Sequence, residues 1–331
     1  MEHKKITIKF SYPPFWDNLG GDFLAQTQGR DGVWGRYKFE INNHVKKCDY
    51  WFVCEDHSIY FHDTAFCPPE NCILITNEEK SMWDYPIPYL KQFGKILTSR
   101  DDIQHKCAIR TQHLAPWHIK RNYDFLKNCS VPIKKCNLSS VTSNAVFLEG
   151  HIRRYKLLNR LKGHFKDKLH WFGRGERPLE DKWDGIAPYR YSIAIENSAH
   201  IHYFTEKILD CYLAFTMPIY WGCPNILDYF PKESLILIED IDDYKKSILQ
   251  IESAVDEGKF DNNFNYILQA RKLTLDKYQV FAFLGKWLDD QEQNTKSAKN
   301  ILIKSKAYYQ SNLTLKQKIY SKYQYFNLRF G

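Results

Sequence analysis

Short apolar runs that end in polar residues recur along the chain and constrain its fold more than any other feature of the sequence. These runs are KKITIKFSY, KKCDYWFVCE, NCILITNEE and GKILTSRDD in the first half, and LSSVTSN, KLHWFG, YRYSIAIE, MPIYWG and SLILIED in the second. The segments at 150–165 and 204–215, which lie between such runs, have helical patterns. This alternation predicts parallel β-sheets covered by crossover helices, which is an α/β fold.

The chain is long enough for two such domains in tandem. Its 331 residues allow each domain a core of its own. The stretch 108–137 contains the Pro-bearing sequences APW and VPIKKCN and looks like a connection between domains. We therefore predict an N-terminal domain over 1–130, a second domain over 131–290 and a tail over 291–331.

The net charge of +8 is concentrated at the C-terminal end. The stretch 294–331 contains no Asp or Glu, and the remaining chain carries 39 basic and 39 acidic residues. An apolar stripe at helical spacing accompanies the basic residues of this tail: Leu315, Ile319, Tyr323, Phe326 and Phe330. A basic amphipathic helix over 311–331 can bind an anionic membrane surface, and a terminal helix packed against the body is the alternative.

Cysteine usage and hydropathy indicate a cytoplasmic protein. None of the nine Cys residues forms a CxxC pair, so neither a zinc site nor a redox motif is indicated. No apolar run approaches the roughly 20 residues that a membrane-spanning helix needs. We expect reduced thiols, no metal and a cytoplasmic location, with possible peripheral contact at the inner face of the membrane.

The junction IENSAHIHYFTEK, at 195–207, gathers polar side chains where a strand gives way to a helix. Ligands of parallel sheets bind at such edges, and Thr205 can cap the helix that begins at Glu206. The free N–H groups of the helix, with Lys207, suit a phosphate group. Alternatively, Glu206 only complements the helix dipole and Lys207 is a solvated surface residue.

This region resembles glycosyltransferase family 10, the α-1,3/4-fucosyltransferases. The segments YRYSIAIENS, YFTEK and MPIYWG match the order and spacing of the family's motifs, as in its bacterial members, over about 139–243. The resemblance implies a GT-B fold, in which two Rossmann-like domains face each other across a cleft. It also implies an inverting transfer from a nucleotide-sugar without a metal ion or another cofactor.

The resemblance assigns donor-binding positions to this sequence. Asn197, Tyr203, Glu206 and Lys207 fall on them, with Glu206 expected near the sugar ring and Lys207 near the phosphates. The helix containing HIRRYKLLNRL matches the segment that carries a diphosphate-binding arginine. Arg154 fits that position best, and the neighbouring Arg153 is a second candidate.

The base that accepts the proton of the acceptor hydroxyl should come from the other domain. Bacterial members carry an acidic residue in a T-G-E-like context, and Glu78 in TNE takes that position, with Asn77 in place of Gly. Glu79 is adjacent, so either glutamate can be the base, or both can be solvated loop residues.

The function that the resemblance implies is transfer of fucose from GDP-fucose to a glycan hydroxyl, for example of lipopolysaccharide O-antigen. A different nucleotide-sugar donor with the same fold and mechanism is the first alternative. A non-catalytic protein that binds nucleic acid through its basic tail is a remote one, because the rest of the chain is neutral. We expect no nucleic acid partner.

Overall fold

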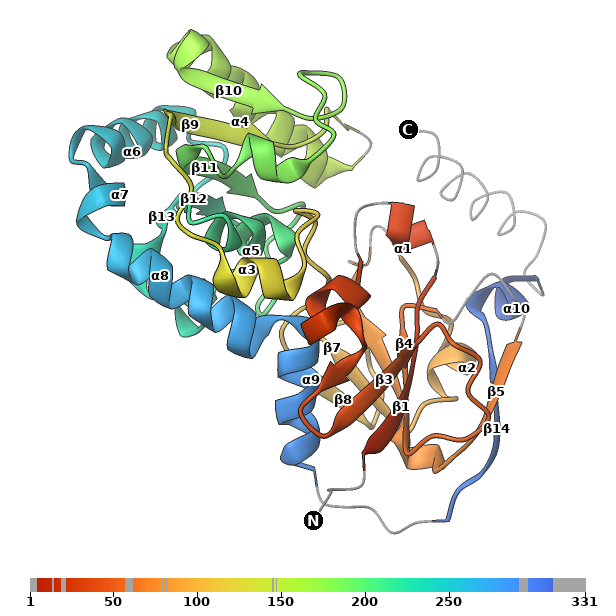
Figure 1. Ribbon diagram of the computed structural model, residues 1–331. Helices are drawn as coiled ribbons and strands as arrows, with labels where there is room; N and C mark the ends of the chain where they lie inside the picture. Colours follow the sequence, from red (N-terminus) through yellow and green to blue (C-terminus); the bar gives the residue numbers. More distant parts are fainter. Residues whose placement is uncertain are drawn as a thin grey trace. The chain divides into compact units, whose positions relative to one another are not determined.

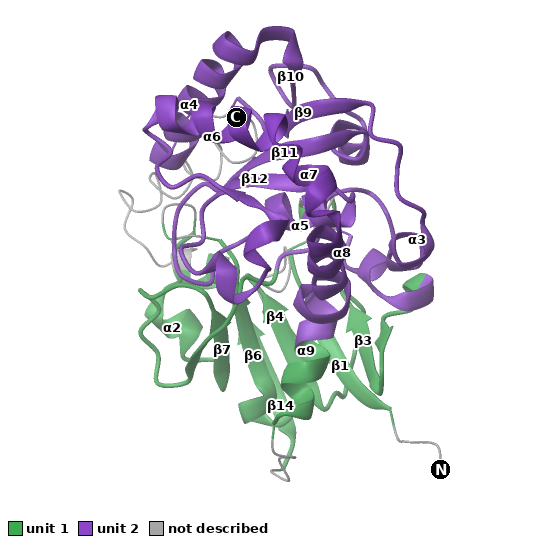
Figure 2. Cartoon of the chain, turned by 90° about the vertical axis from the view of Figure 1, so that its left-hand side faces the viewer, with its two compact units in different colours: residues 1–19, 30–114, 284–331 green, residues 20–29, 115–283 purple. Residues whose placement is uncertain are grey.

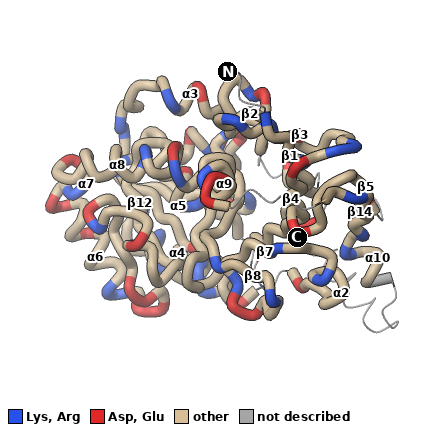
Figure 3. The backbone as a smooth tube through the Cα atoms, turned by 90° about the horizontal axis from the view of Figure 1, so that it is seen from below, with Lys and Arg blue, Asp and Glu red and all other residues tan. Residues whose placement is uncertain are grey.

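The computed structural model describes residues 5–13, 15–18, 22–56, 62–78, 80, 83–144, 146, 148–291 and 297–311. The chain forms two compact units, shown in green and purple in Figure 2. Unit 1 comprises 1–19, 30–114 and 284–331, and unit 2 comprises 20–29 and 115–283. Figure 3 shows that Lys and Arg positions are interspersed with Asp and Glu positions in both units.

Unit 1 contains a mainly parallel sheet of seven strands in the order β2-β3-β1-β4-β6-β7-β8 (Figure 1). These strands are β1 (Ile6–Ser11), β2 (Val33–Trp34), β3 (Tyr37–Ile41), β4 (Tyr50–Cys54), β6 (Cys72–Thr76), β7 (Lys95–Thr98) and β8 (Ala108–Arg110). Every neighbouring pair is parallel except β2 and β3. The central strands β4 and β6 are buried at nearly every position, as their apolar sequences predict. The helices α1 (Phe15–Asn18) and α2 (Ile87–Leu90) are short.

Unit 2 contains a fully parallel sheet of five strands in the order β10-β9-β11-β12-β13. Its strands are β9 (Cys136–Val141), β10 (Leu169–Phe172), β11 (Tyr189–Ile195), β12 (Met217–Trp221) and β13 (Ile236–Leu237). Its helices are α3 (Tyr123–Asn128), α4 (Glu149–Phe165), α5 (Glu206–Leu213), α6 (Tyr244–Asp256), α7 (Lys259–Asn262) and α8 (Phe264–Leu273). The chain adds β10 on one side of β9 and then β11 on the other, so the strand order reverses between β9 and β11. Such a reversal is where open α/β sheets bind ligands.

The predicted class, two Rossmann-like α/β domains in one chain as in the GT-B fold, is confirmed by the two parallel sheets. The boundaries of the units differ from those predicted. The segment after Ala115 already belongs to unit 2, since the ring of Phe125 on α3 packs on Trp183 at a centroid distance of 5.7 Å. The chain returns to unit 1 within α9 (Val280–Asp289), where Trp287 packs on Phe52 at 6.1 Å.

The segment predicted as a tail over 291–331 is partly built into unit 1. Strand β14 (Lys299–Lys304) pairs antiparallel with β5 (His62–Cys67), and α10 (Lys306–Ser311) follows. Ile303 of β14 is fully buried. Strands β14 and β5 form a two-stranded sheet that is separate from the seven-stranded one. A separate C-terminal tail beginning at 291 is therefore wrong, because hydrogen bonds and an apolar side chain fix 299–304 to the body. The stripe from Leu315 to Phe330 lies outside the described residues.

Candidate functional site

The start of helix α5 is fixed to the end of strand β11 by Glu196 and Thr205. Thr205 caps the helix, as predicted, because its hydroxyl oxygen accepts the N–H of Lys207 at 3.4 Å. The N–H and hydroxyl groups of Thr205 in turn donate to the two oxygens of Glu196, each at 2.8 Å. Glu196 directly follows β11 and is fully buried. Its carboxylate therefore joins the strand end to the helix start.

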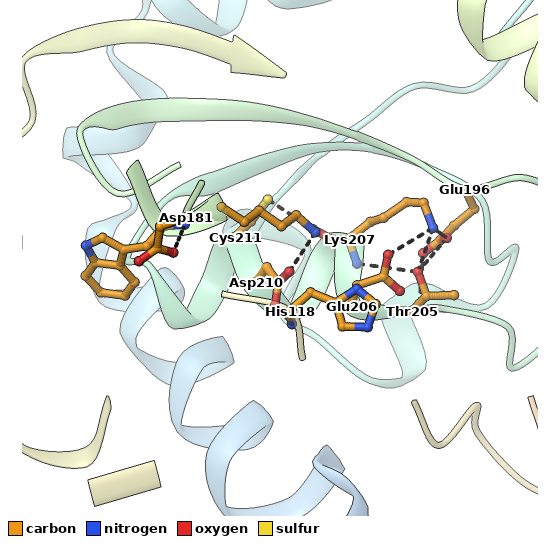
Figure 4. A network of polar contacts seen from close by, with 10 residues as sticks. His118, Asp181, Glu196, Thr205, Glu206, Lys207, Asp210 and Cys211 are labelled. Carbon is orange, nitrogen blue, oxygen red and sulfur yellow. Dashed lines mark hydrogen bonds and ion pairs between the residues drawn. The ribbon is translucent and has the colours of Figure 1, made fainter. Parts of the chain in front are cut away.

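Lys207 lies at the centre of this network (Figure 4). Its Nζ atom is 3.2 Å from Glu196 Oε2, 3.3 Å from Glu206 Oε1 and 3.1 Å from Thr205 Oγ1. Burial acts to lower the pKa of Lys207, but the carboxylates of Glu196 and Glu206 outweigh it and raise that pKa. Only 17% of the Lys207 side chain and 16% of the Glu206 side chain are exposed. Neither is a solvated surface residue, so that alternative is wrong.

Arg154 enters the same site from helix α4. It is buried, and its Nη1 donates to the side-chain oxygen of Asn197, which follows Glu196. The helix approaches the backbone here at Gly150, where a Cβ atom would lie 1.5 Å from the carbonyl oxygen of Asn197. Burial lowers the pKa of Arg154, although Glu196, Glu206 and Tyr203 oppose that shift.

The neighbouring candidate Arg153 has different partners. Its guanidinium pairs with Asp242 at 2.9 Å and lies over the ring of Trp221, 5.2 Å from the centroid. Its side chain is 34% exposed. Of the two arginines, the structure brings only Arg154 to the predicted donor-binding residues.

Tyr203 lies next to this network and is buried, with its N–H donating to the carbonyl of His200 at 3.1 Å. It contributes to the electrostatic environment of Arg154. The structure therefore collects all five predicted donor-binding residues, Arg154, Asn197, Tyr203, Glu206 and Lys207, in unit 2. Their roles in binding a donor remain predictions.

A second ion pair borders the site and was missed by sequence reasoning. Asp210, one turn after Glu206 on α5, is fully buried and accepts from Lys182 Nζ at 2.7 Å and from the N–H of His118 at 3.1 Å. The ring of His118 lies beside Glu206 (Figure 4). Burial acts to raise the pKa of Glu206, but Lys207, His118 and Lys182 together hold it well below its usual range. The one sequence signal was an acidic residue within the apolar helix ILDCYL.

A small pocket, partly open to solvent, lies at this edge of the unit 2 sheet. Its walls include the ends of β9 and β11, where the strand order reverses, and the side chains of Arg154, Lys182 and Lys207. The carboxylates of Glu196, Glu206 and Asp210 are not among its lining groups. Three cationic residues therefore line the pocket and these carboxylate residues do not, an arrangement that suits an anionic ligand.

The predicted base Glu78 lies in unit 1, directly after β6. It is half-buried, and its N–H donates to Glu55 Oε1 at 2.6 Å. Asn77, which stands where the family has Gly, exchanges hydrogen bonds with the backbone of Leu114, at 2.9 Å and 3.0 Å. Glu79 lies outside the described residues. Glu55 was not identified from the sequence, since nothing local distinguishes it from other acids at strand ends.

The acidic segment EDIDD at 239–243 has structural partners. Asp243 caps helix α6 by accepting the N–H of Lys246 at 3.0 Å. Asp242 pairs with Arg153, and Glu239 pairs with Lys246. Among the residues that the structure describes, no helix is long and apolar enough to cross a membrane.

A parallel sheet with a cation-lined pocket at its reversal defines an α/β protein whose pocket suits an anionic ligand. Residues 131–281, all within unit 2, match the model described as glycosyltransferase family 10 (fucosyltransferase) C-term, which supports the resemblance seen in the sequence.

Two named relatives match shorter stretches of the chain. Alpha-(1,3)-fucosyltransferase FucT of Helicobacter pylori is 31% identical over 70 residues, which cover 21% of this chain and 15% of the relative. Alpha-(1,3)-fucosyltransferase B of Drosophila melanogaster is 31% identical over 80 residues, which cover 24% and 18%. A solved structure of an alpha1,3-fucosyltransferase with GDP-fucose is 18% identical with a TM-score of 0.49, covering 85% of this chain and 94% of that one.

Proposed function

We propose that this chain transfers fucose from GDP-fucose to a hydroxyl group of a glycan, with inversion at the sugar carbon and without a metal ion. The observation that carries the proposal is the pocket at the strand-order reversal of unit 2, which three cations line and their carboxylate partners do not. The match of residues 131–281 to a fucosyltransferase family model supports fucose as the transferred sugar. Whether the donor is GDP-fucose or another nucleotide-sugar is decided by the experiment below.

The donor site serves the departing diphosphate in this proposal. As the bond between the sugar carbon and the phosphate oxygen breaks, negative charge develops on the diphosphate. Arg154 and Lys207, with Lys182 on the same wall, stabilise that charge in place of a metal ion. Glu206, ionised at neutral pH because its pKa is held low, favours the positive character of the sugar ring.

The acceptor side of the reaction belongs to Glu78. The acceptor oxygen forms a bond to the sugar carbon, the diphosphate leaves with the electron pair of the broken bond, and Glu78 takes the hydroxyl proton. Its place at the carboxyl end of β6 supports this role, because functional groups of parallel sheets gather at that edge. Lipid-linked glycans such as O-antigen precursors are the acceptor class we propose, with 311–331 contacting the anionic membrane surface.

The two adjacent arginines of α4 provide a matched test. Mass spectrometry with GDP-fucose and other nucleotide-sugars is expected to show release or transfer of fucose by the wild-type protein. Arg154→Met should lower this rate by roughly two to three orders of magnitude. Arg153→Met, on the same helix but paired with Asp242, should leave it near the wild-type rate. Equal loss in both variants, or turnover of a different donor only, would contradict the proposal.

A further inference from the structure

Glu55 is a buried carboxylate at the carboxyl end of β4, the strand beside β6 in unit 1. Its Oε1 atom accepts the successive backbone N–H groups of Asn77 and Glu78, the latter at 2.6 Å. Its Oε2 atom accepts the hydroxyl of Tyr85. Glu55 adopts a positive φ of 67°, a conformation that costs a non-glycine residue energy and that a surrounding network must hold. The side chain therefore fixes the turn that follows β6.

Arg100 binds the other backbone polar group of Glu78, its carbonyl oxygen. It follows β7, the next strand of the sheet, and is buried. Its Nη1 donates to the carbonyl of Glu78 at 3.2 Å and to the carbonyl of Trp83. The other guanidinium nitrogens form a two-pronged pair with Asp102 at 2.9 Å and 2.7 Å. Both backbone polar groups of Glu78 are thus bound by buried charged side chains from neighbouring strand ends.

Glu55 and Arg100 share Tyr85 as an aromatic neighbour, and the charged residue Lys306 lies near the same ring. The Arg100 guanidinium lies over the Tyr85 ring at 5.1 Å, and the Tyr85 hydroxyl binds Glu55. Lys306 of α10 is also buried, with Nζ 5.3 Å from the same ring, and its N–H donates to Asp56 at 2.9 Å. Burial raises the pKa of Glu55, which Lys306 and the hydrogen bonds counteract. The cluster is a satisfied network and not an accidental buried charge.

We propose that Glu55 and Arg100 are positioning residues that hold Glu78 in place to accept the proton of the acceptor. The inference rests on the proposed function, in which Glu78 is the base. The half-buried Glu78 lies in the segment just after β6, where a backbone without side-chain partners would sample several orientations. Two fixed hydrogen bonds to its own peptide groups restrict that freedom, and a displacement of about 1 Å can cost a hundredfold in rate.

A double-mutant cycle tests the positioning role. Glu55→Ala is expected to lower single-turnover transfer about a hundredfold while GDP affinity stays unchanged. In a Glu78→Gln background the same substitution should have no further effect, because the group that Glu55 positions is already inactive. Glu55→Gln keeps an acceptor for both N–H groups and should stay within about threefold of the wild-type rate. A loss of equal size in both backgrounds, or in Glu55→Gln, would overturn the inference.

Asp49→Ala is the matched control. Asp49 precedes β4 at its opposite end and also accepts a backbone N–H, from Thr7 at 2.8 Å. Asp49→Ala should retain wild-type transfer, since it removes an exposed side-chain hydrogen bond to a backbone N–H of unit 1, away from Glu78. Loss of activity in this variant similar to that of Glu55→Ala would point to general destabilisation of the unit and would overturn the positioning role.

Amide hydrogen exchange gives a readout that does not depend on activity. Exchange at Asn77 and Glu78 should accelerate at least about tenfold in Glu55→Ala and remain slow in Asp49→Ala. If the wild-type protein does not transfer fucose, or Glu78→Gln is fully active, the proposed function or its base fails, and exchange still reports whether Glu55 fixes the turn. Unchanged exchange in Glu55→Ala would overturn the inference directly.

Discussion

Replacing Lys207 by Met is expected to have two separable effects, because its ammonium group neutralises a buried carboxylate and also lines the pocket. Glu196 is fully buried and contacts this ammonium at 3.2 Å, in addition to two neutral donors from Thr205. An unpaired buried charge destabilises a fold by about 3–5 kcal/mol. For a unit of this size, the midpoint of thermal unfolding should fall by roughly 10 °C.

A second substitution, Glu196→Gln, separates stability from binding. The neutral amide needs no counter-charge, and its oxygen can still accept the N–H of Thr205, so most of the lost stability should return. The affinity for GDP should stay low, because the double variant still lacks one charged donor to phosphate. Such a hydrogen bond contributes about 1.5–3 kcal/mol, which corresponds to roughly a 10- to 100-fold change in Kd.

Urea unfolding and isothermal titration with GDP measure the two effects on the wild-type protein, the two single variants and the double variant. The exposed pair Lys246 and Glu239, also in unit 2, is the control, since its side chains are 51% and 62% exposed. Substitution of that pair should change the free energy of unfolding by less than about 1 kcal/mol and leave GDP binding unchanged. Wild-type GDP affinity in the double variant Lys207→Met, Glu196→Gln would refute the phosphate-binding role of Lys207.

Three further outcomes are expected. Transfer should survive excess EDTA, because protein cations line the pocket where other transferases place a metal ion; loss of activity with EDTA and rescue by Mn²⁺ would contradict this. Burial, with the charges of Arg154 and Lys207, lowers the pKa of His151 from 6.5 to about 4. The unfolded chain therefore binds a proton here more readily than the folded one, so the free energy of unfolding should decrease as the pH falls from about 6.5 to about 4. Acid unfolding of His151→Gln should show a smaller decrease. Deleting 312–331 should weaken binding to anionic liposomes and preserve transfer to a soluble acceptor, whereas unfolding of the truncated protein would favour a packed terminal helix.

Local features of the sequence predicted much of both sheets and the donor-side helix. Strands β1, β4, β6 and β7 of unit 1, the five strands of unit 2 and the helices α4 and α5 follow from apolar runs and helical spacing, which act over a few residues. Strands β2, β3, β5 and β8 were not predicted, and β8 lies within the stretch 108–137 that was predicted as a connection. The cap at Thr205 follows from a short hydroxyl side chain directly before a helical pattern. These features depend on neighbours in the chain, and a sequence displays such neighbours directly.

Contacts between distant segments could not be predicted in the same way. Strand β14 pairs with β5 more than two hundred residues earlier, and neither alternation nor composition marks that pairing. Glu55 acts on Asn77 and Glu78 only because β4 and β6 are adjacent in the sheet. Lys182 meets Asp210 through a loop with no periodic pattern. In each case the partner is chosen by the strand order, which a single sequence does not specify.

The contacts of Lys207 have a consequence for donor binding in the proposed function. An ammonium group has three N–H donors, and Lys207 already has three acceptors, on Glu196, Glu206 and Thr205. A phosphate oxygen that binds Lys207 must therefore take the place of one of them. Glu196 is fully buried, so releasing it would leave an unpaired charge at a cost of several kcal/mol.

Of the two carboxylate acceptors, Glu206 can be released at the lower cost. Its contact with Lys207 is the longest of the three at 3.3 Å, and 16% of its side chain is exposed to solvent. Phosphate binding would thus free the Glu206 carboxylate from Lys207 at the moment when the sugar arrives beside it. In the proposed function, displacement of Glu206 and not of Thr205 would couple occupancy of the phosphate site to the availability of the carboxylate beside the sugar.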